Sequence, residues 1–233
     1  VRGLAHRTMA DDSSGGLNGG FTDVMRKTAG SRWESVVNHR FADELGAGTI
    51  SPEVMKRYCI QDHRFLDSFV ILLASMVAHA PSLLDRIPGC QFLALITGRE
   101  NTFFERTFDA LGVTAEARDV PDEPCTAEFK RLMLDAAGSG SLVEMLSVLV
   151  VCEWSYQSWG ERVLPSSTAE PWWCREWVAL HSGEYFGSVV GYLRGLLDRE
   201  AAKLSDSELV GARARFMQAV EVENAFFDMA YNC

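Results

Sequence analysis

Three acidic side chains in this chain fall where a helical core would place leucine or phenylalanine. Asp62 lies on an apolar stripe of the segment that begins at Ser51, and Glu223 lies on another near the C-terminal end. Glu153 continues a third apolar line, and Cys152 directly precedes it. The apolar residues of these stripes are Met55, Cys59, Leu66, Phe69, Leu73 and Met76; Leu142, Leu146 and Leu149; and Leu209, Phe216, Val220, Phe227 and Ala230. We therefore expect the three carboxyls and the thiol to point inward.

Buried acids need a reason, because an unpaired carboxylate is costly to remove from water. A single buried acid often pairs with an arginine or a backbone group, but few arginines lie on these stripes. Three acids on separate helices instead predict a closed polar pocket, and acids in such a cleft suit acid–base chemistry. Cys152 has two interpretations: it is a nucleophile beside Glu153, or it is an inert core thiol.

The elements that must position these residues are all helical. No strand-like alternation or hairpin turn signal occurs between the apolar runs. Ser51 is a candidate N-cap with Pro52 at the first helical position, a helix following "RIPG" ends at Gly112, and 141–144 reads as a capping box before the central helix. The sequence predicts an all-α, single-domain bundle of about seven or eight helices.

Composition limits the classes of function. The net charge is −10 and no run of lysine or arginine occurs, which disfavours binding to nucleic acid or to an anionic membrane. No apolar run approaches the roughly 20 residues that span a bilayer. The 6 cysteines are irregularly spaced, which favours reduced thiols and a cytoplasmic location. Residues 1–20 are polar and rich in glycine and serine, so we expect a disordered tail before a domain at 21–233.

Four segments in order resemble the TenA/thiaminase II family. They are "FADELGAGTISPEVMKRYCIQDHRFLDSF", "GSLVEMLSVLVVCEWSYQSWGERV", "WVALHSGEYFGSVV" and "AVEVENAFFDMAYN", and they span about residues 25–231. The resemblance implies an all-α fold shared with haem oxygenase. It also implies an aminopyrimidine hydrolase of thiamin salvage that needs no cofactor or metal.

The resemblance carries roles for four residues. Asp62 matches the acid that hydrogen-bonds the aminopyrimidine, and Glu223 matches the acid that engages the pyrimidine ring nitrogen. Cys152 aligns with the nucleophile of the cysteine-type subgroup. Glu153 aligns with the glutamate of the other subgroup, which lacks that cysteine. Since this chain has both residues, the resemblance leaves open which of them is essential.

The aromatic residues that the resemblance places at the substrate differ from the cysteine-type pattern. Phe65, Phe129 and His181 stand where that pattern has tyrosine, whereas Tyr156 is kept. We expect these four residues and Phe227 to bind the substrate. The replaced tyrosines and the Glu153 context favour the glutamate-type subgroup.

The predicted reaction converts 4-amino-5-aminomethyl-2-methylpyrimidine, or its N-formyl form, to hydroxymethylpyrimidine. Thiaminase II activity stays open. One alternative is a non-catalytic pyrimidine-binding or regulatory protein, and a less favoured one is a di-iron oxygenase, because the chain lacks Glu-x-x-His. The expected partners are a small pyrimidine and further copies of this chain in a dimer or tetramer, with no nucleic acid and no membrane.

Overall fold

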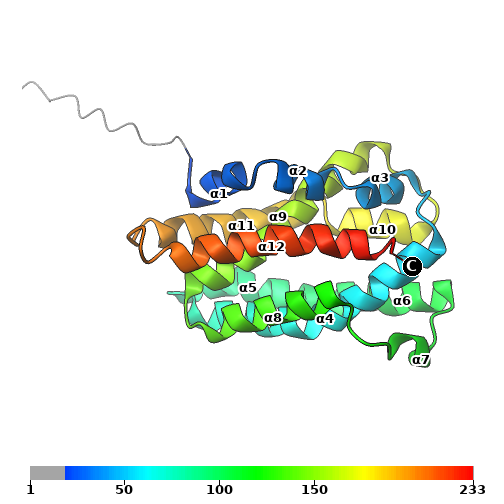
Figure 1. Ribbon diagram of the computed structural model, residues 1–233, viewed down its shortest axis with the longest axis horizontal. Helices are drawn as coiled ribbons and strands as arrows, with labels where there is room; N and C mark the ends of the chain where they lie inside the picture. The colour runs from blue at the N-terminus through cyan, green and yellow to red at the C-terminus, as the bar shows by residue number, and fades with distance from the viewer. Residues whose placement is uncertain (1–18, 233) are drawn as a thin grey trace, which may run out of the picture.

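The computed structural model describes residues 19–232, and most of the predicted disordered tail lies outside this range. This part of the chain forms one all-helical domain without strands, which confirms the predicted fold class (Figure 1). The α-helices are α1 (Phe21–Ala29), α2 (Ser31–Val37), α3 (Arg40–Ala47), α4 (Pro52–His79), α5 (Leu83–Leu95), α6 (Asn101–Leu111), α7 (Ala115–Arg118), α8 (Pro124–Gly138), α9 (Leu142–Val163), α10 (Trp172–Leu180), α11 (Gly183–Ala201) and α12 (Val210–Met229).

The prediction of seven or eight helices was wrong, because several predicted segments are broken. The region 172–201 forms two helices: Ser182 is extended between them and Gly183 has φ 80°, a left-handed value that favours glycine. Leu164–Ser166 adds a short 3₁₀ turn after α9. These breaks change the direction of the chain, so that α10 and α11 pack separately.

Local signals fixed some helix ends and not others. The Ser51 hydroxyl accepts a hydrogen bond from the amide of Val54 at 3.3 Å, and Gly112 caps α6 with φ 66°, as predicted. The capping box at 141–144 does not form. Ser141 makes no capping bond, and Glu144 instead accepts a hydrogen bond from Arg215 at 3.3 Å.

The helix predicted after "RIPG" begins earlier and changes its winding. α5 starts at Leu83 and continues through Pro88, and a π-helical segment at Ile96–Glu100 then joins it to α6. Such π segments often occur at functional sites. This one turns the Ile96 and Glu100 side chains inward, since both are buried.

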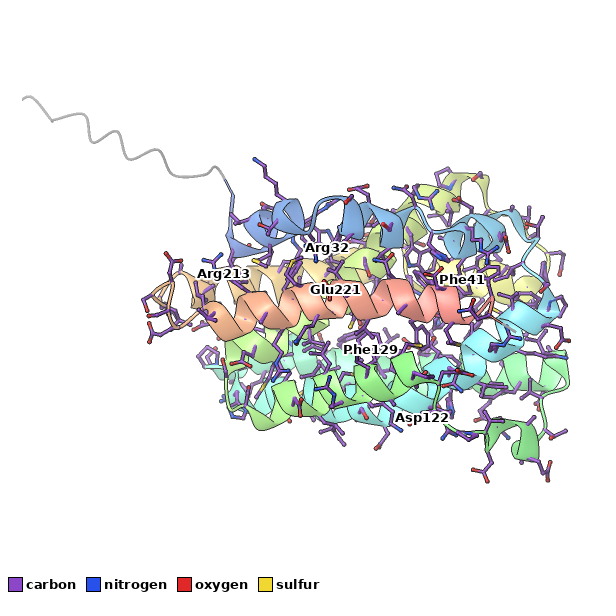
Figure 2. All side chains as sticks on the ribbon, in the orientation of Figure 1. Arg32, Phe41, Asp122, Phe129, Arg213 and Glu221 are labelled. Atoms are coloured by element: carbon purple, nitrogen blue, oxygen red, sulfur yellow. The ribbon has the colours of Figure 1, made fainter. Side chains whose placement is uncertain are left out.

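α9 forms the centre of the bundle. Sixteen of its 22 residues are buried, which confirms that all its faces are covered. It packs against α12, α11, α4, α8 and α2. At the surface, the Arg32 guanidinium lies 2.6 Å from the Glu221 carboxylate and joins α2 to α12 (Figure 2). No described helix is both long enough and apolar enough to cross a lipid bilayer.

Candidate active site

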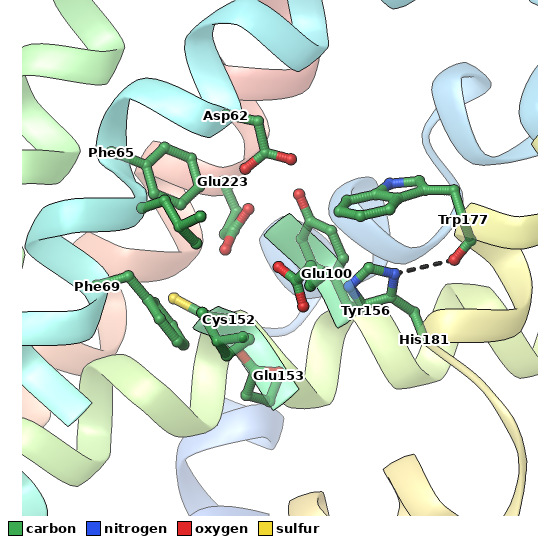
Figure 3. Close-up of a pocket in the computed structure, with 12 residues that line it drawn as sticks. Asp62, Phe65, Phe69, Glu100, Cys152, Glu153, Tyr156, Trp177, His181 and Glu223 are labelled. Carbon is green, nitrogen blue, oxygen red and sulfur yellow. Dashed lines mark hydrogen bonds between the residues drawn. The ribbon is translucent and has the colours of Figure 1, made fainter. Parts of the chain in front are cut away.

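A partly open cavity lies between α4, the π segment, α9, α10 and α12 (Figure 3). Its walls combine acidic, aromatic and apolar side chains. The lining residues are Asp62, Phe65, Leu66, Phe69, Ile96, Glu100, Cys152, Glu153, Tyr156, Trp177, His181 and Glu223. A concave site with a few convergent polar groups is typical of small-molecule binding. The structure therefore brings the predicted acids and the thiol together at one cavity.

Asp62 and Glu223 enter the cavity from α4 and α12, and both are buried. One oxygen of each carboxyl, Oδ2 of Asp62 and Oε2 of Glu223, has no hydrogen-bond partner among the described residues. Burial raises the pKa of Asp62 to about 7, although a hydrogen bond with Tyr58 acts to lower it. Burial, and then the nearby charge of Asp62, raise the pKa of Glu223 to about 8. Both acids can therefore exchange protons near neutral pH.

Cys152 and Glu153 face the same cavity from successive positions of α9. The Cys152 thiol is hydrogen-bonded to the Glu223 carboxyl. Burial raises the thiol's pKa well above its ordinary value, and the charges of Glu223 and Glu153 raise it further. Burial, followed by the charges of Glu223 and Asp62, also raises the pKa of Glu153 well above the ordinary range. The site therefore favours a neutral thiol and a protonated Glu153.

A pair of tyrosines supports the acids from behind. The Tyr58 and Tyr156 hydroxyls are 2.8 Å apart, and Tyr58 is also hydrogen-bonded to Asp62. Tyr58 is fully buried in α4, one turn before Asp62. Sequence reasoning missed its role, because a tyrosine on an apolar stripe looks like an ordinary core residue. The pair fixes the orientation of Asp62 and of Tyr156.

His181 follows α10 and lies in the cavity wall with its tautomer fixed. Its Nδ1 is 3.0 Å from the carbonyl oxygen of Trp177, so Nδ1 carries the proton and Nε2 is left as an acceptor (Figure 3). Burial lowers the pKa of His181 to about 4, although this hydrogen bond acts to raise it. Gly160 on α9 lets the His181 backbone approach closely, because any side chain there would meet its carbonyl oxygen.

The five predicted substrate-binding residues divide into two groups. Phe65, Tyr156 and His181 line the cavity, but Phe129 and Phe227 do not. The Phe129 ring lies 5.2 Å from the Phe65 ring, and the Phe227 ring lies 5.7 Å from the Tyr156 ring. They are packed behind the wall and support it. Helical spacing identified them as buried, but it does not tell which buried side chains border a cavity.

Glu100 is a fourth acid in the cavity that sequence reasoning missed. It comes from the π segment and is 9% exposed. The sequence contains a signal for it, because Glu100 interrupts an apolar stripe formed by Phe92, Ile96, Phe103 and Phe104. This is the same pattern that identified the other three acids.

The acidic side chains of the cavity have no cationic side chain beside them among the described residues of the cavity wall. No lysine or arginine lines the cavity in the part of the chain that the structure describes. Within residues 19–232, no cluster of histidine, cysteine and acidic side chains has an arrangement that would hold a metal ion. Four carboxyls in such a space are stable if they keep their protons or if a ligand donates hydrogen bonds to them.

Comparisons with known proteins agree with this architecture. An aminopyrimidine aminohydrolase of Halalkalibacterium halodurans is 27% identical over 203 residues, covering 86% of this chain and 90% of that protein. An aminopyrimidine aminohydrolase of Bacillus subtilis is 24% identical over 223 residues, covering 91% of this chain and 89% of that protein. The structure of a TenA homologue from Pyrococcus furiosus superposes with a TM-score of 0.81 at 23% identity, covering 91% of this chain and 100% of that one.

The solved structure is similar in fold, and the two relatives are similar along nearly their whole length. A family model described as the TENA/THI-4/PQQC family matches residues 26–233. This match includes every helix that contributes to the cavity. The chain therefore belongs to the TENA/THI-4/PQQC family.

Proposed function

We propose that the protein hydrolyses the C–N bond of a 5-aminomethyl-4-aminopyrimidine and releases hydroxymethylpyrimidine and ammonia. The observation that carries the proposal is the pair of unpartnered carboxyl oxygens on Asp62 and Glu223 in an aromatic-walled cavity. An aminopyrimidine presents an amino group beside a ring nitrogen, and it supplies polar partners that such oxygens lack. The relatives named aminopyrimidine aminohydrolase support the same substrate class.

The two acids suit a proton exchange across the pyrimidine. Glu223, with a pKa of about 8, gives a proton to the ring nitrogen conjugated with the methylene-bearing carbon. Asp62, with a pKa of about 7, accepts a proton from the amino group. The ring is then an imino tautomer with an N–H that can push an electron pair toward the methylene carbon. This step activates the leaving amine without any attack on the ring.

The C–N bond then breaks and its electron pair leaves with the nitrogen. Glu153 supplies a proton to the amine, which departs as ammonia, and an exocyclic methylene remains on the ring. Water adds its oxygen to that methylene carbon and gives a proton to Glu153, while Glu223 and Asp62 reverse their proton exchange and restore the amino group. The product is the hydroxymethylpyrimidine. Asp62, Glu153 and Glu223 therefore each have one defined proton to hold or move.

In this proposal Glu153, and not Cys152, is the essential catalytic residue of α9. A nucleophile would need the thiolate form, whereas burial and the adjacent acids raise the pKa of this thiol. Its hydrogen bond to Glu223 instead suits a residue that orients the Glu223 carboxyl. The protein is accordingly proposed to act as a glutamate-type hydrolase in which Glu153 is essential and Cys152 is not.

The test measures release of hydroxymethylpyrimidine from thiamin, from the aminomethylpyrimidine and from its N-formyl form in separate reactions. The variants are Cys152→Ser and Glu153→Gln, with Asp109→Asn as a control that removes an exposed carboxyl from α6. We expect release from an aminopyrimidine that survives in the serine variant and the control but is lost in the glutamine variant. Cleavage of thiamin that disappears with Cys152 would instead identify a thiaminase. Binding of the pyrimidines without any release would favour the non-catalytic alternative.

The predicted dimer or tetramer and the predicted cytoplasmic location remain predictions. Light scattering of the purified protein tests the first. Fractionation of cells that produce it tests the second.

A further inference from the structure

The fourth acid, Glu100, has no assigned task in the reaction described above. Its side chain is buried and faces the cavity from the π segment. No hydrogen bond or ion pair satisfies its carboxyl within the part of the chain that the structure describes. A buried acid that served the fold alone would normally have an arginine, a lysine or a backbone amide as its partner. Glu100 therefore has no role in the fold that a partner among the described residues would indicate.

The role that we assign to Glu100 involves Glu153. It faces the same cavity from α9, and it too has no hydrogen-bond partner among the described residues. Burial raises the pKa of Glu100 well above its ordinary range, and the charge of Glu153 is the next largest cause. The two carboxyls therefore face one cavity, although they come from elements far apart in the sequence.

No other polar group of the cavity, among the described residues, makes a hydrogen bond to this pair. Asp62 and Glu223 are themselves acids with an unpartnered oxygen, and neutral His181 presents an acceptor at Nε2. No lysine or arginine among the described residues lines the space. What the cavity lacks is a group with several N–H donors and a positive charge. A primary ammonium group has three N–H donors and one unit of charge.

We propose that Glu100 is a specificity residue that, with Glu153, holds the departing nitrogen of the substrate as a primary ammonium group. This inference rests on the function proposed above and assigns that site its leaving group. Glu153 gives its proton to the amine and becomes the carboxylate partner of the resulting ammonium, and Glu100 accepts a second N–H. The C–N bond then breaks with its electron pair on nitrogen, and ammonia leaves. Water supplies the hydroxyl of the product, and its proton returns to Glu153.

This arrangement discriminates among the three candidate substrates. The nitrogen of an N-formyl group is neutral and has one N–H, so it cannot supply donors to both carboxyls. The thiazolium nitrogen of thiamin is charged but has no N–H. The primary amine alone satisfies both acids, and recognition of hydrogen-bonding groups discriminates strongly against analogues that lack them. The site is therefore proposed to prefer the free aminomethyl compound.

The experiment compares the aminomethylpyrimidine with the hydroxymethylpyrimidine, which differs only at the group that Glu100 is proposed to hold. KM and kcat are measured for the amine, and the inhibition constant is measured for the hydroxymethyl compound, in the wild type, Glu100→Gln and Asp109→Asn. Losing a hydrogen bond to a charged group should raise KM for the amine by about 10- to 100-fold in Glu100→Gln. The inhibition constant of the hydroxymethyl compound should change by less than about threefold, and the control should match the wild type.

The outcomes separate this inference from the proposed function. Equal weakening of both ligands in Glu100→Gln, or no change in either, overturns the role of Glu100 while turnover by the wild type upholds the function. If the wild type binds both compounds without turnover, calorimetric dissociation constants replace KM, and the same selective loss supports the ammonium site although the hydrolase is overturned. Failure of the wild type to bind either compound overturns both. Should Glu100→Gln not fold, the wild type alone decides, since equal affinity for the two compounds contradicts an ammonium site.

Discussion

Replacing Glu223 with glutamine should stabilise the unliganded protein at neutral pH while it stops the reaction. Glu223 is 2% exposed, and its pKa rises from 4.5 in the ordinary state to about 8 in the fold. Folding therefore takes up a proton at this site whenever the pH lies between these two values. Glutamine has a similar shape and does not titrate, so the substitution removes that proton uptake; it also removes the charge that raises the pKa of Cys152 and of Glu153.

The sign and the size follow from the linkage between protons and folding. The wild-type contribution is fully present below pH 4.5 and is lost as the pH rises through about 8. One proton taken up on folding changes the free energy of unfolding by about 1.4 kcal/mol for each pH unit. From pH 4.5 to 7.5 the wild type should lose roughly 4 kcal/mol relative to Glu223→Gln. Near pH 4.5 the two proteins should differ little, because the Gln carbonyl can still accept the Cys152 hydrogen bond.

The assay is urea denaturation at pH 5, 6, 7 and 8, at one protein concentration so that any assembly equilibrium is held fixed. The difference in the free energy of unfolding between Glu223→Gln and wild type should grow steadily with pH. Asp109→Asn, which removes an exposed carboxyl, should show no such growth. Parallel pH curves for wild type and Glu223→Gln would refute the reasoning, since they would mean that Glu223 does not keep its proton when it is buried. Loss of turnover in the same variant checks its catalytic role separately.

Three further predictions concern the groups around the acids. Tyr58→Phe removes the hydroxyl that contacts Tyr156 at 2.8 Å, so unfolding should become easier by about 1–3 kcal/mol in urea denaturation; an unchanged midpoint would contradict a structural role for this bond. Gly160→Ala forces a methyl group against the His181 carbonyl oxygen, so the free energy of unfolding should fall by about 1–3 kcal/mol and turnover should decrease. Unchanged stability and activity would show that the backbone at His181 can move away from α9 without loss. The His181 ring should stay neutral with its proton on Nδ1 down to about pH 5 in ¹H–¹⁵N spectra, because its pKa is lowered to about 4; a titration near 6.5 would contradict its burial.

The sequence by itself determined where acids enter the core. Helical periodicity places every third or fourth residue on one face, so an acid on an apolar stripe must be buried whatever the neighbouring helix is. Asp62, Glu153 and Glu223 occupy such positions in the sequence, and Glu100 occupies one in its own segment. The cap at Ser51 was equally local, since it needs only the next few residues.

Only the tertiary structure decided which buried side chains meet. Phe129 and Phe227 are as buried as Phe65, yet the crossing of the helices places them behind the cavity wall. The Tyr58–Tyr156 pair, and the cavity that Glu100 and Glu153 both line, join elements far apart in the chain, and no spacing rule encodes them. Periodicity is set by hydrogen bonds across about four residues, whereas a cavity is the space left where several helices fail to fill one another's surfaces. The sequence thus specified the chemical groups, and the packing of α4, α9, α12 and the π segment made them one site.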